Sequence, residues 1–408
     1  MTPKVTMLIG PRSTPAITYG MSIGFDLLIS GFEDRILPHI VIDRTQGMEG
    51  KKIGTFTLGG TLVTFSQFAA FYKTLHRAHT VYMTIGTSRA GFFRDMIMTW
   101  SARFWRKRIV LHLHGGGFLD FYQTSPAWLQ AFMRQTFART DTIIVLGKLL
   151  RDQFEFVPEI NNKLAVVPNG LPKELENQDV RTKEISPSEP FRVLYLSNMI
   201  PSKGYLDVLE ACRILRYERQ IPIQCDFCGA FLQTVTTQEF ITPATAEDQF
   251  NKLIQAKKLE GIVSYHGTVR GIQKQHMLQQ AHAFVLPTNY PWEGQPISII
   301  EALAFALPVV ATEYRGIPEQ VVDGYNGFLL KQKTPGRIAD AIETLWRDPV
   351  LYNQLSQNAL DHYQKNFTQK AHLDRLIPII LGPNFVARSV NNQEQTLIQS
   401  SMGDDQKS

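Results

Sequence analysis

Short apolar runs alternate with amphipathic, helical patterns along most of this 408-residue chain. Many of the runs end in glycine, asparagine or another small residue, which places loops at the ends of strands. This alternation is typical of parallel sheets covered by helices. The expected strands are KVTMLIG, ILPHIVID, VYMTIG, RIVLHLHG, DTIIVLG and KLAVVPNG in the first part of the chain, and FRVLYLSN, IPIQCDFCG, GIVSYHG, AFVLPT and LPVVAT in the second.

The rhythm of strands and helices starts twice, which predicts two α/β domains. Residues 172–190 between the two series are charged, proline-flanked and without apolar periodicity, as expected of a linker. We therefore expect two doubly wound parallel sheets with a cleft between them, the first with the linker over residues 1–190 and the second over 191–365. Residues 366–384 are expected to form a C-terminal helix that packs back toward the first domain, and residues 385–408 a polar tail.

Composition points to a folded, water-soluble chain. Hydrophobic residues make up 44% and charged residues 19%, and the formal net charge is +5. That charge is too small for a nucleic-acid binder, although it favours phosphorylated ligands or an anionic membrane surface. No apolar stretch reaches the roughly 18 residues that span a bilayer, and the N-terminus does not resemble a signal peptide, so we expect a cytoplasmic protein. The CDFC segment lies on an expected strand, which indicates buried thiols rather than a zinc or redox site.

Two carboxylates flank the start of an apolar segment: Glu293 lies just before ISIIEALAFALPVV, and Glu301 lies within it. Two interpretations of Glu301 stay open. Ser298 and Glu301 have the spacing of a capping box, with Pro296 in the first helical turn, which would give Glu301 a purely structural role. Alternatively, both carboxylates face the cleft and accept hydrogen bonds from sugar hydroxyls at two ends of one ligand.

Lys203 lies in the turn SKG after the expected strand FRVLYLSN, where a helix begins. A lysine on the first helical turn opposes the helix dipole. Together with the exposed amides of the helix start, however, its ammonium group would hold a diphosphate. The stretch lacks the GxxxxGK[ST] pattern and is not a Walker loop. A solvated surface lysine is the alternative.

The segment HLHGGGF ends an expected strand with three glycines, which let backbone amides approach a ligand. His112 and His114 are expected on the same strand face, but they lack a third metal ligand. The HGGG run resembles the oxyanion loop of α/β-hydrolases. The segment GTSRAG, however, lacks the final glycine of a nucleophile elbow and precedes the HGGG run instead of following it. TYGMSIG does not form GxGxxG, which argues against a dinucleotide oxidoreductase.

Residues 100–108, WSARFWRKR, form a basic and aromatic end to an expected helix. This composition is typical of interfacial membrane binding. Basic residues are also favoured at a helix C-terminus, so an ordinary joint between a helix and a strand is the alternative.

Taken in order, these segments resemble the retaining glycosyltransferases of family 4, which have the GT-B fold of two Rossmann-like domains. The resemblance covers nearly the whole chain and rests on GPRSTPAITYG, HLHGGGF, VVPNGL, LSNMIPSKG, SYHGTV and LPTNYPWEGQPISIIEALAFALPVVAT, followed by RGIPEQVVDGYNGFLL. Two glutamates separated by seven residues are the signature of that family. The resemblance implies an N-terminal acceptor-binding domain, a C-terminal domain that binds a nucleotide diphosphate sugar, and retaining transfer of the sugar without a metal or another cofactor.

The resemblance also implies roles for individual residues. His114 would lie under the reacting sugar, Lys203 would hold the diphosphate, and Glu293 would lie at the hydroxyls of the transferred sugar. Glu301 would bind the ribose, and the segment around Gly267 would flank the nucleobase. The residues implied to bind the donor are Asn198, Lys203, Gly267, Val269, Glu293, Gly294, Ile297 and Glu301. The candidates on the acceptor side are Tyr19, Gly20, Ser88, Arg89, Gly115 and Gly116.

The chain departs from the family pattern at three positions. Asn198 stands where arginine is common, so phosphate neutralisation would rest more on Lys203. Ala306 replaces a common glycine, and Tyr19 precedes Gly20 where two glycines are common. The resemblance leaves open a UDP- or GDP-linked donor and implies a glycan or glycolipid acceptor, as in cell-surface polysaccharide synthesis. It leaves as alternatives a nucleotide-sugar epimerase of the same fold and a non-catalytic nucleotide-sugar-binding protein.

Overall fold

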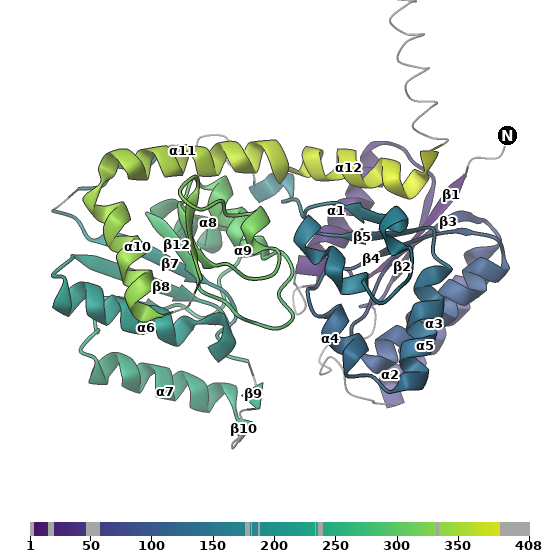
Figure 1. Ribbon diagram of the computed structural model, residues 1–408, viewed down its shortest axis with the longest axis horizontal. Coiled ribbons are helices and arrows are strands. Elements are labelled where there is room, and N and C mark those ends of the chain that lie inside the picture. The colour runs from purple at the N-terminus through teal and green to yellow at the C-terminus, as the bar shows by residue number, and fades with distance from the viewer. Residues whose placement is uncertain are drawn as a thin grey trace, which may run out of the picture.

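The computed structural model describes residues 4–14, 20–45, 58–175, 180, 182–186, 188–232, 234–235, 240–331 and 334–383. Of residues 58–62, 175, 234–235 and 240–241 it describes the backbone alone. Two six-stranded sheets, each flanked by helices, form the centres of the two halves of the described chain (Figure 1). All strand pairs within these two sheets are parallel, which confirms the expected α/β fold class.

The first sheet has the strand order β2-β1-β3-β4-β5-β6. Its strands are β1 (Val5–Gly10), β2 (His39–Asp43), β3 (Ala78–Thr84), β4 (Arg108–His112), β5 (Thr142–Val145) and β6 (Leu164–Val166). The helices of this half are α1 (Gly20–Asp34), α2 (Leu58–Leu75), α3 (Arg89–Phe104), α4 (Phe118–Gln123) and α5 (Ala127–Ala138), with the 3-10 helices η1 (Lys148–Phe154), η2 (Ile160–Lys163) and η3 (Lys173–Leu175). Separate apolar clusters form around this sheet, one with α3 and α5 and the other with α1.

The second sheet has the strand order β11-β8-β7-β12-β13-β14. Its strands are β7 (Phe191–Leu196), β8 (Ile223–Cys228), β11 (Val263–Tyr265), β12 (Ala283–Leu286), β13 (Val309–Thr312) and β14 (Gly327–Leu330). A separate antiparallel pair joins β9 (Thr234–Val235) and β10 (Phe240–Ile241). The helices are η4 (Pro201–Lys203), α6 (Tyr205–Arg213), the π-helix η5 (Ile214–Glu218), α7 (Pro243–Ala256), α8 (Gly271–Gln280), α9 (Ile297–Ala304), η6 (Ile317–Glu319), α10 (Pro335–Arg347) and α11 (Pro349–Asn366).

The last helix, α12 (Gln369–Leu381), returns to the first sheet. Figure 1 shows α11 along the second sheet and α12 over the first. Leu373 and Ile377 of α12 belong to the same buried cluster as Phe25 and Phe32 of α1, so α12 completes the apolar core on that face. The helix begins after Thr368, whose side chain accepts a hydrogen bond from the N–H of Ala371, as an N-cap does.

Each strand expected from the apolar runs is present. The runs do not predict β9, β10 and β14. All three cysteines, Cys212, Cys225 and Cys228, are free and buried, as the strand position of CDFC predicts.

Candidate functional site

Loops from the two sheets meet beyond the carboxyl ends of β4 and β12. The N–H of Gly116, after β4, donates a hydrogen bond of 3.3 Å to the carbonyl of Trp292, between β12 and α9. A Cβ at Gly116 would lie 1.8 Å from the carbonyl oxygen of Glu293, and a Cβ at Gly117 would lie 2.3 Å from the Trp292 ring. Gly116 and Gly117 therefore let the loop after β4 lie closer to the loop after β12 than residues with a side chain would permit.

Glu293 is buried at this junction, with 7% of its surface exposed. The hydroxyl of Thr288 donates to its Oε2 at 3.0 Å, and Nζ of Lys203 lies 3.2 Å from the same oxygen. The ammonium group of Lys203 also lies 5.1 Å from the ring centroid of Tyr290, a cation–π distance. A carboxylate and an ammonium group are thus held together at the edge of the second sheet, where α/β sheets bind ligands.

Lys203 ends η4 and precedes α6, so it is not on the first turn of that helix. Gly204 follows in the left-handed region, with φ of +80°, and a Cβ there would lie 2.5 Å from the carbonyl oxygen of Pro287. The tight turn holds Lys203 beside the loop after β12. Its side chain is 14% exposed, which argues against the solvated surface lysine.

Glu301 does not form a capping box. Helix α9 begins at Ile297 with Pro296 as its N-cap, so Ser298 is already inside the helix, and the cap carries no side-chain hydrogen bond. The carboxylate of Glu301 instead pairs with Lys274 of α8, with 2.5 Å between Nζ and Oε1. The capping interpretation is therefore wrong, and the buried charge of Glu301 is balanced by a lysine from a neighbouring helix.

His114 has both ring nitrogens buried without a hydrogen-bond partner among the described residues. Burial lowers its pKa to about 3, with a smaller contribution from His372, so the ring is neutral. The ring centroids of His112 and His114 lie 4.0 Å apart, which confirms that the two histidines share a face. Buried polar atoms are normally paired, so a neutral imidazole with two free nitrogens has the capacity to bind a polar ligand.

Several other predicted residues lie where the loops after β4 and β12 meet, at residues 114–117 and 292–297, which we call the contact region. A Cβ at Gly20, the first residue of α1, would lie 3.2 Å from Ile297. A Cβ at Gly294 would lie 2.8 Å from the carbonyl oxygen of His114, and one at Gly115 would lie 3.6 Å from that of Trp292. The start of α1, the glycine loop and the start of α9 are therefore in contact.

The remaining predicted residues are not joined to that region by these contacts. The carbonyl of Gly267 accepts from the N–H of Gly229 at 2.7 Å, and the side chain of Val269 belongs to the apolar core. Asn198 is exposed in the loop after β7. Ser88 is the N-cap of α3, accepting from the N–H of Gly91, and Arg89 is the exposed first residue of that helix. Tyr19 lies outside the described residues.

A buried pair that the sequence patterns do not reveal joins the two halves of the site. The backbone N–H of Asn169 donates to Oε1 of Gln295 at 2.7 Å, and the Asn169 amide donates to the Gln295 carbonyl at 3.1 Å. Arg315 pairs with Asp120 at 2.7 Å, and the Glu319 carboxylate accepts from two N–H groups at the start of η1. These contacts hold the loop after β12 and the segment after β13 against the first domain.

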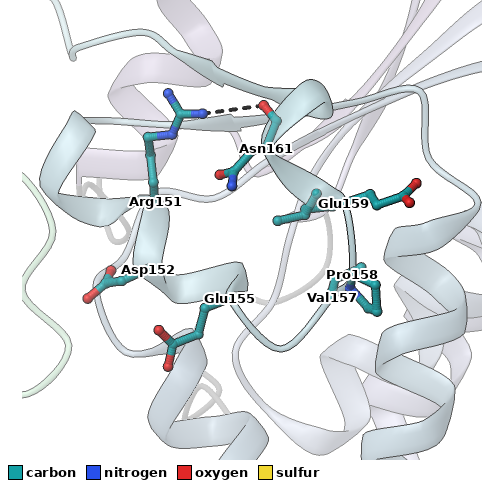
Figure 2. Close-up of a pocket in the computed structure, with 8 residues that line it drawn as sticks. Arg151, Asp152, Glu155, Val157, Pro158, Glu159 and Asn161 are labelled. Atoms are coloured by element: carbon teal, nitrogen blue, oxygen red, sulfur yellow. Dashed lines mark hydrogen bonds between the residues drawn. The ribbon is translucent and has the colours of Figure 1, made fainter.

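Within the described residues, no group of three or more His, Cys, Asp or Glu side chains could hold a metal ion. A hollow of about 310 Å³ lies between η1 and η2, lined by residues 151, 152, 155 and 157–161, and Arg151 donates to the carbonyl of Asn161 there at 3.3 Å (Figure 2). The residues of the contact region do not line it. None of the described helices is both long enough and apolar enough to cross a membrane.

Comparison with known proteins agrees with this architecture. Residues 176–362 match the family model for glycosyl transferases group 1, so the chain carries a domain of that group. The amylovoran biosynthesis glycosyltransferase AmsK of Erwinia amylovora is 27% identical over 197 residues, covering 47% of this chain and 44% of AmsK. The putative colanic acid biosynthesis glycosyltransferase WcaL of Escherichia coli is 24% identical over 245 residues, covering 59% and 54%. The chain thus spans about half the length of these curated relatives.

Among solved structures, Anabaena Alr3699/HepE in complex with UDP and glucose matches with a TM-score of 0.65. The two chains are 18% identical, and the match covers 93% of this chain and 100% of HepE. The likeness supports the GT-B arrangement of two Rossmann-like domains. The expected fold is therefore confirmed.

Proposed function

We propose that this chain is a retaining glycosyltransferase that moves a sugar from a nucleotide diphosphate sugar to an acceptor hydroxyl. The observation that carries the proposal is the ion pair of the partly buried Lys203 with the buried Glu293, 3.2 Å apart, against a glycine loop that presents His114. An ammonium group, a carboxylate and a neutral imidazole at one junction match the needs of a donor with a diphosphate and sugar hydroxyls.

In this mechanism the bond between the anomeric carbon and the leaving phosphate oxygen breaks, and a bond from the acceptor oxygen to that carbon forms on the same face. The acceptor proton passes to the departing phosphate. The ammonium group of Lys203 would move from Glu293 to the diphosphate. There it would stabilise the negative charge that develops on the leaving phosphate, and stabilisation of such charge is usually the largest single contribution to catalysis. Glu293 and His114 would then hold the hydroxyls of the transferred sugar.

Glu301 would bind the ribose, and the loops that carry Asn198, Gly267 and Val269 would hold the diphosphate and the base. No metal ion or other cofactor enters these steps. A UDP- or GDP-linked donor and a glycan or glycolipid acceptor of cell-surface polysaccharide synthesis fit the names of AmsK and WcaL and the UDP in the HepE complex.

The test is thermal stabilisation of the purified protein by UDP-, GDP- and ADP-sugars without added metal, followed by an assay for nucleotide release. One nucleotide class should stabilise the protein, and Glu301→Ala should lose that shift. Glu189→Ala, at an exposed position outside the site, serves as the matched control and should keep it. An equal shift in Glu301→Ala would contradict the assigned role.

Assays on the same proteins distinguish the transferase from two alternative functions. A nucleotide-sugar epimerase would convert the donor sugar without an acceptor and without net release of nucleotide. A non-catalytic binding protein would be stabilised by the donor and would not turn it over in the presence of any acceptor. Slow donor hydrolysis that depends on Lys203 and Glu293 would support transfer.

A further inference from the structure

Three adjacent helices of the first domain expose aromatic side chains on one face. Helices α2, α3 and α5 pack side by side and lie together at the lower right of Figure 1. The exposed hydrophobic residues of this aromatic face are Phe65, Tyr72, Ile97, Phe104, Trp105, Trp128 and Phe132, with Phe104 exposed to 86%. Large apolar groups in such number on one surface usually mark an interaction site.

Contacts between the helices make this face continuous. The hydroxyl of Tyr72 on α2 lies 2.8 Å from that of Ser101 on α3. The ring of Phe93 on α3 stacks on Trp128 of α5, with centroids 5.6 Å apart, and Trp100 lies 6.0 Å from Phe132.

The exposed charged residues on the three helices of this face are all basic. Over the described lengths of α2, α3 and α5 the one carboxylate is Asp95, which is 3% exposed and pairs with Arg44 at 2.8 Å. Asp141, just beyond α5, lies 3.9 Å from Arg103. The exposed basic residues on and beside the face are Lys73, Arg77, Arg103, Arg106, Arg134 and Arg139.

We propose that the aromatic face binds the surface of a bilayer that contains anionic phospholipids, at the inner face of the cell membrane. Tryptophan and phenylalanine insert at the boundary of headgroups and acyl chains, and lysine and arginine beside them attract anionic headgroups. An anionic bilayer offers one sign of charge beside an apolar interior, which fits three helices whose exposed charges are positive and whose exposed apolar side chains are mostly aromatic.

The position of the face connects it to the site, and this part of the inference rests on the proposed function. Helix α3 begins at Ser88 and Arg89, the acceptor-side candidates after β3, and ends at Phe104 and the exposed Trp105. A membrane bound along α3 would present a lipid-linked acceptor to the end of that helix nearest the contact region. The acceptor class that this surface favours is therefore a glycolipid.

The experiment is co-sedimentation of the full chain with vesicles of phosphatidylcholine alone and of phosphatidylcholine mixed with phosphatidylglycerol. We expect at least about tenfold tighter binding to the mixed vesicles, weakened by salt. The double variant Phe104→Ser/Trp105→Ser should bind about tenfold more weakly. Val350→Ser, at a position on α11 that is 78% exposed, is the matched control and should bind unchanged.

Absence of vesicle binding, or equal affinity for the two kinds of vesicle, would overturn the proposal. Self-association that the double variant abolishes, without vesicle binding, would show that the face joins copies of the chain instead. Donor-induced thermal stabilisation is measured on the same proteins. Vesicle binding without a donor shift would contradict the proposed transferase alone, and a donor shift without vesicle binding would contradict the membrane surface alone.

Discussion

Lys274 and Glu301 form an ion pair across two helices, with Nζ of Lys274 2.5 Å from Oε1 of Glu301. Glu301 is 4% exposed and lies within the apolar helix α9. The pair explains how a carboxylate is kept in that position, because an unpaired buried charge is strongly unfavourable. It also fixes the carboxylate at the edge of the second sheet before a ligand binds.

Removing the side-chain charge of Lys274 should show how strongly the unpaired, buried carboxylate of Glu301 destabilises the protein. We expect Lys274→Met to lower the free energy of unfolding by about 3 kcal/mol, because it leaves an unpaired buried carboxylate. The double variant Lys274→Met/Glu301→Gln should recover most of that loss, since the amide is neutral. Urea unfolding measures both, with Lys252→Met as control, because its ion pair with Asp248 is exposed and contributes little. A double variant no more stable than Lys274→Met would show that charge is not the cause.

The close contact between the loops after β4 and β12 at Gly116 leads to a second prediction. In Gly116→Ala the new Cβ would meet the Glu293 carbonyl oxygen, which is backbone and cannot move aside without shifting the loop. We expect donor turnover to fall by about a hundredfold, because a shift of about 1 Å is enough to misalign a reacting group. Gly336→Ala is the control, since a Cβ there meets no atom within 4 Å. Retained turnover in Gly116→Ala would mean that this contact does not position Glu293.

Most strands and the division into two domains could be predicted, because buried parallel strands appear in the sequence as apolar runs that end in glycine or other small residues. β14 (Gly327–Leu330) is not predicted although it is as long as β5, β12 and β13, because its apolar part, FLL, follows directly on the glycine-containing segment DGYNG. The expected face shared by His112 and His114 followed directly from strand alternation.

The partner of Glu301 could not be predicted, because Lys274 lies 27 positions earlier on another helix and no local spacing connects them. The capping-box spacing at Ser298 was misleading because the helix begins one residue after Pro296, which moves Ser298 inside it. Gln295 and Asn169 are likewise brought together only by the packing of one domain on the other.

The buried hydrogen bonds between Gln295 and Asn169 predict that the protein loses stability when the side-chain amide of Gln295 is removed. Both residues are buried, and Nε2 of Gln295 also donates to the carbonyl of Leu146 at 3.4 Å. Gln295→Leu leaves the N–H of Asn169 without its acceptor, so we expect the free energy of unfolding to fall by about 2 kcal/mol. Urea unfolding measures the change. Gln357→Leu, on the exposed side of α11, should change it by less than about 0.5 kcal/mol, and an equal loss there would contradict the assignment.

Three neutral histidines predict how stability depends on pH. Burial lowers the pKa of His372 to about 4 and that of His114 to about 3, and it holds the pKa of His112 well below its usual 6.5. The unfolded chain therefore binds more protons than the folded chain below about pH 6.5. Their contribution to stability is fully present above that pH and is lost as the pH falls toward 4, at up to about 1.4 kcal/mol per pH unit for each histidine.

His372 offers the cleanest test of this pH dependence, because it lies on α12 and its Nδ1–H donates to the carbonyl of Pro168 at 2.6 Å. We expect His372→Asn, whose amide can keep that hydrogen bond, to make urea unfolding less sensitive to acid between about pH 6.5 and 4. His276→Asn, at an exposed position on α8, should leave the slope unchanged. If the slope of His372→Asn matches that of the native chain, His372 is not a source of the acid sensitivity. A reduced slope would show that acid weakens the packing of α12 against the first sheet.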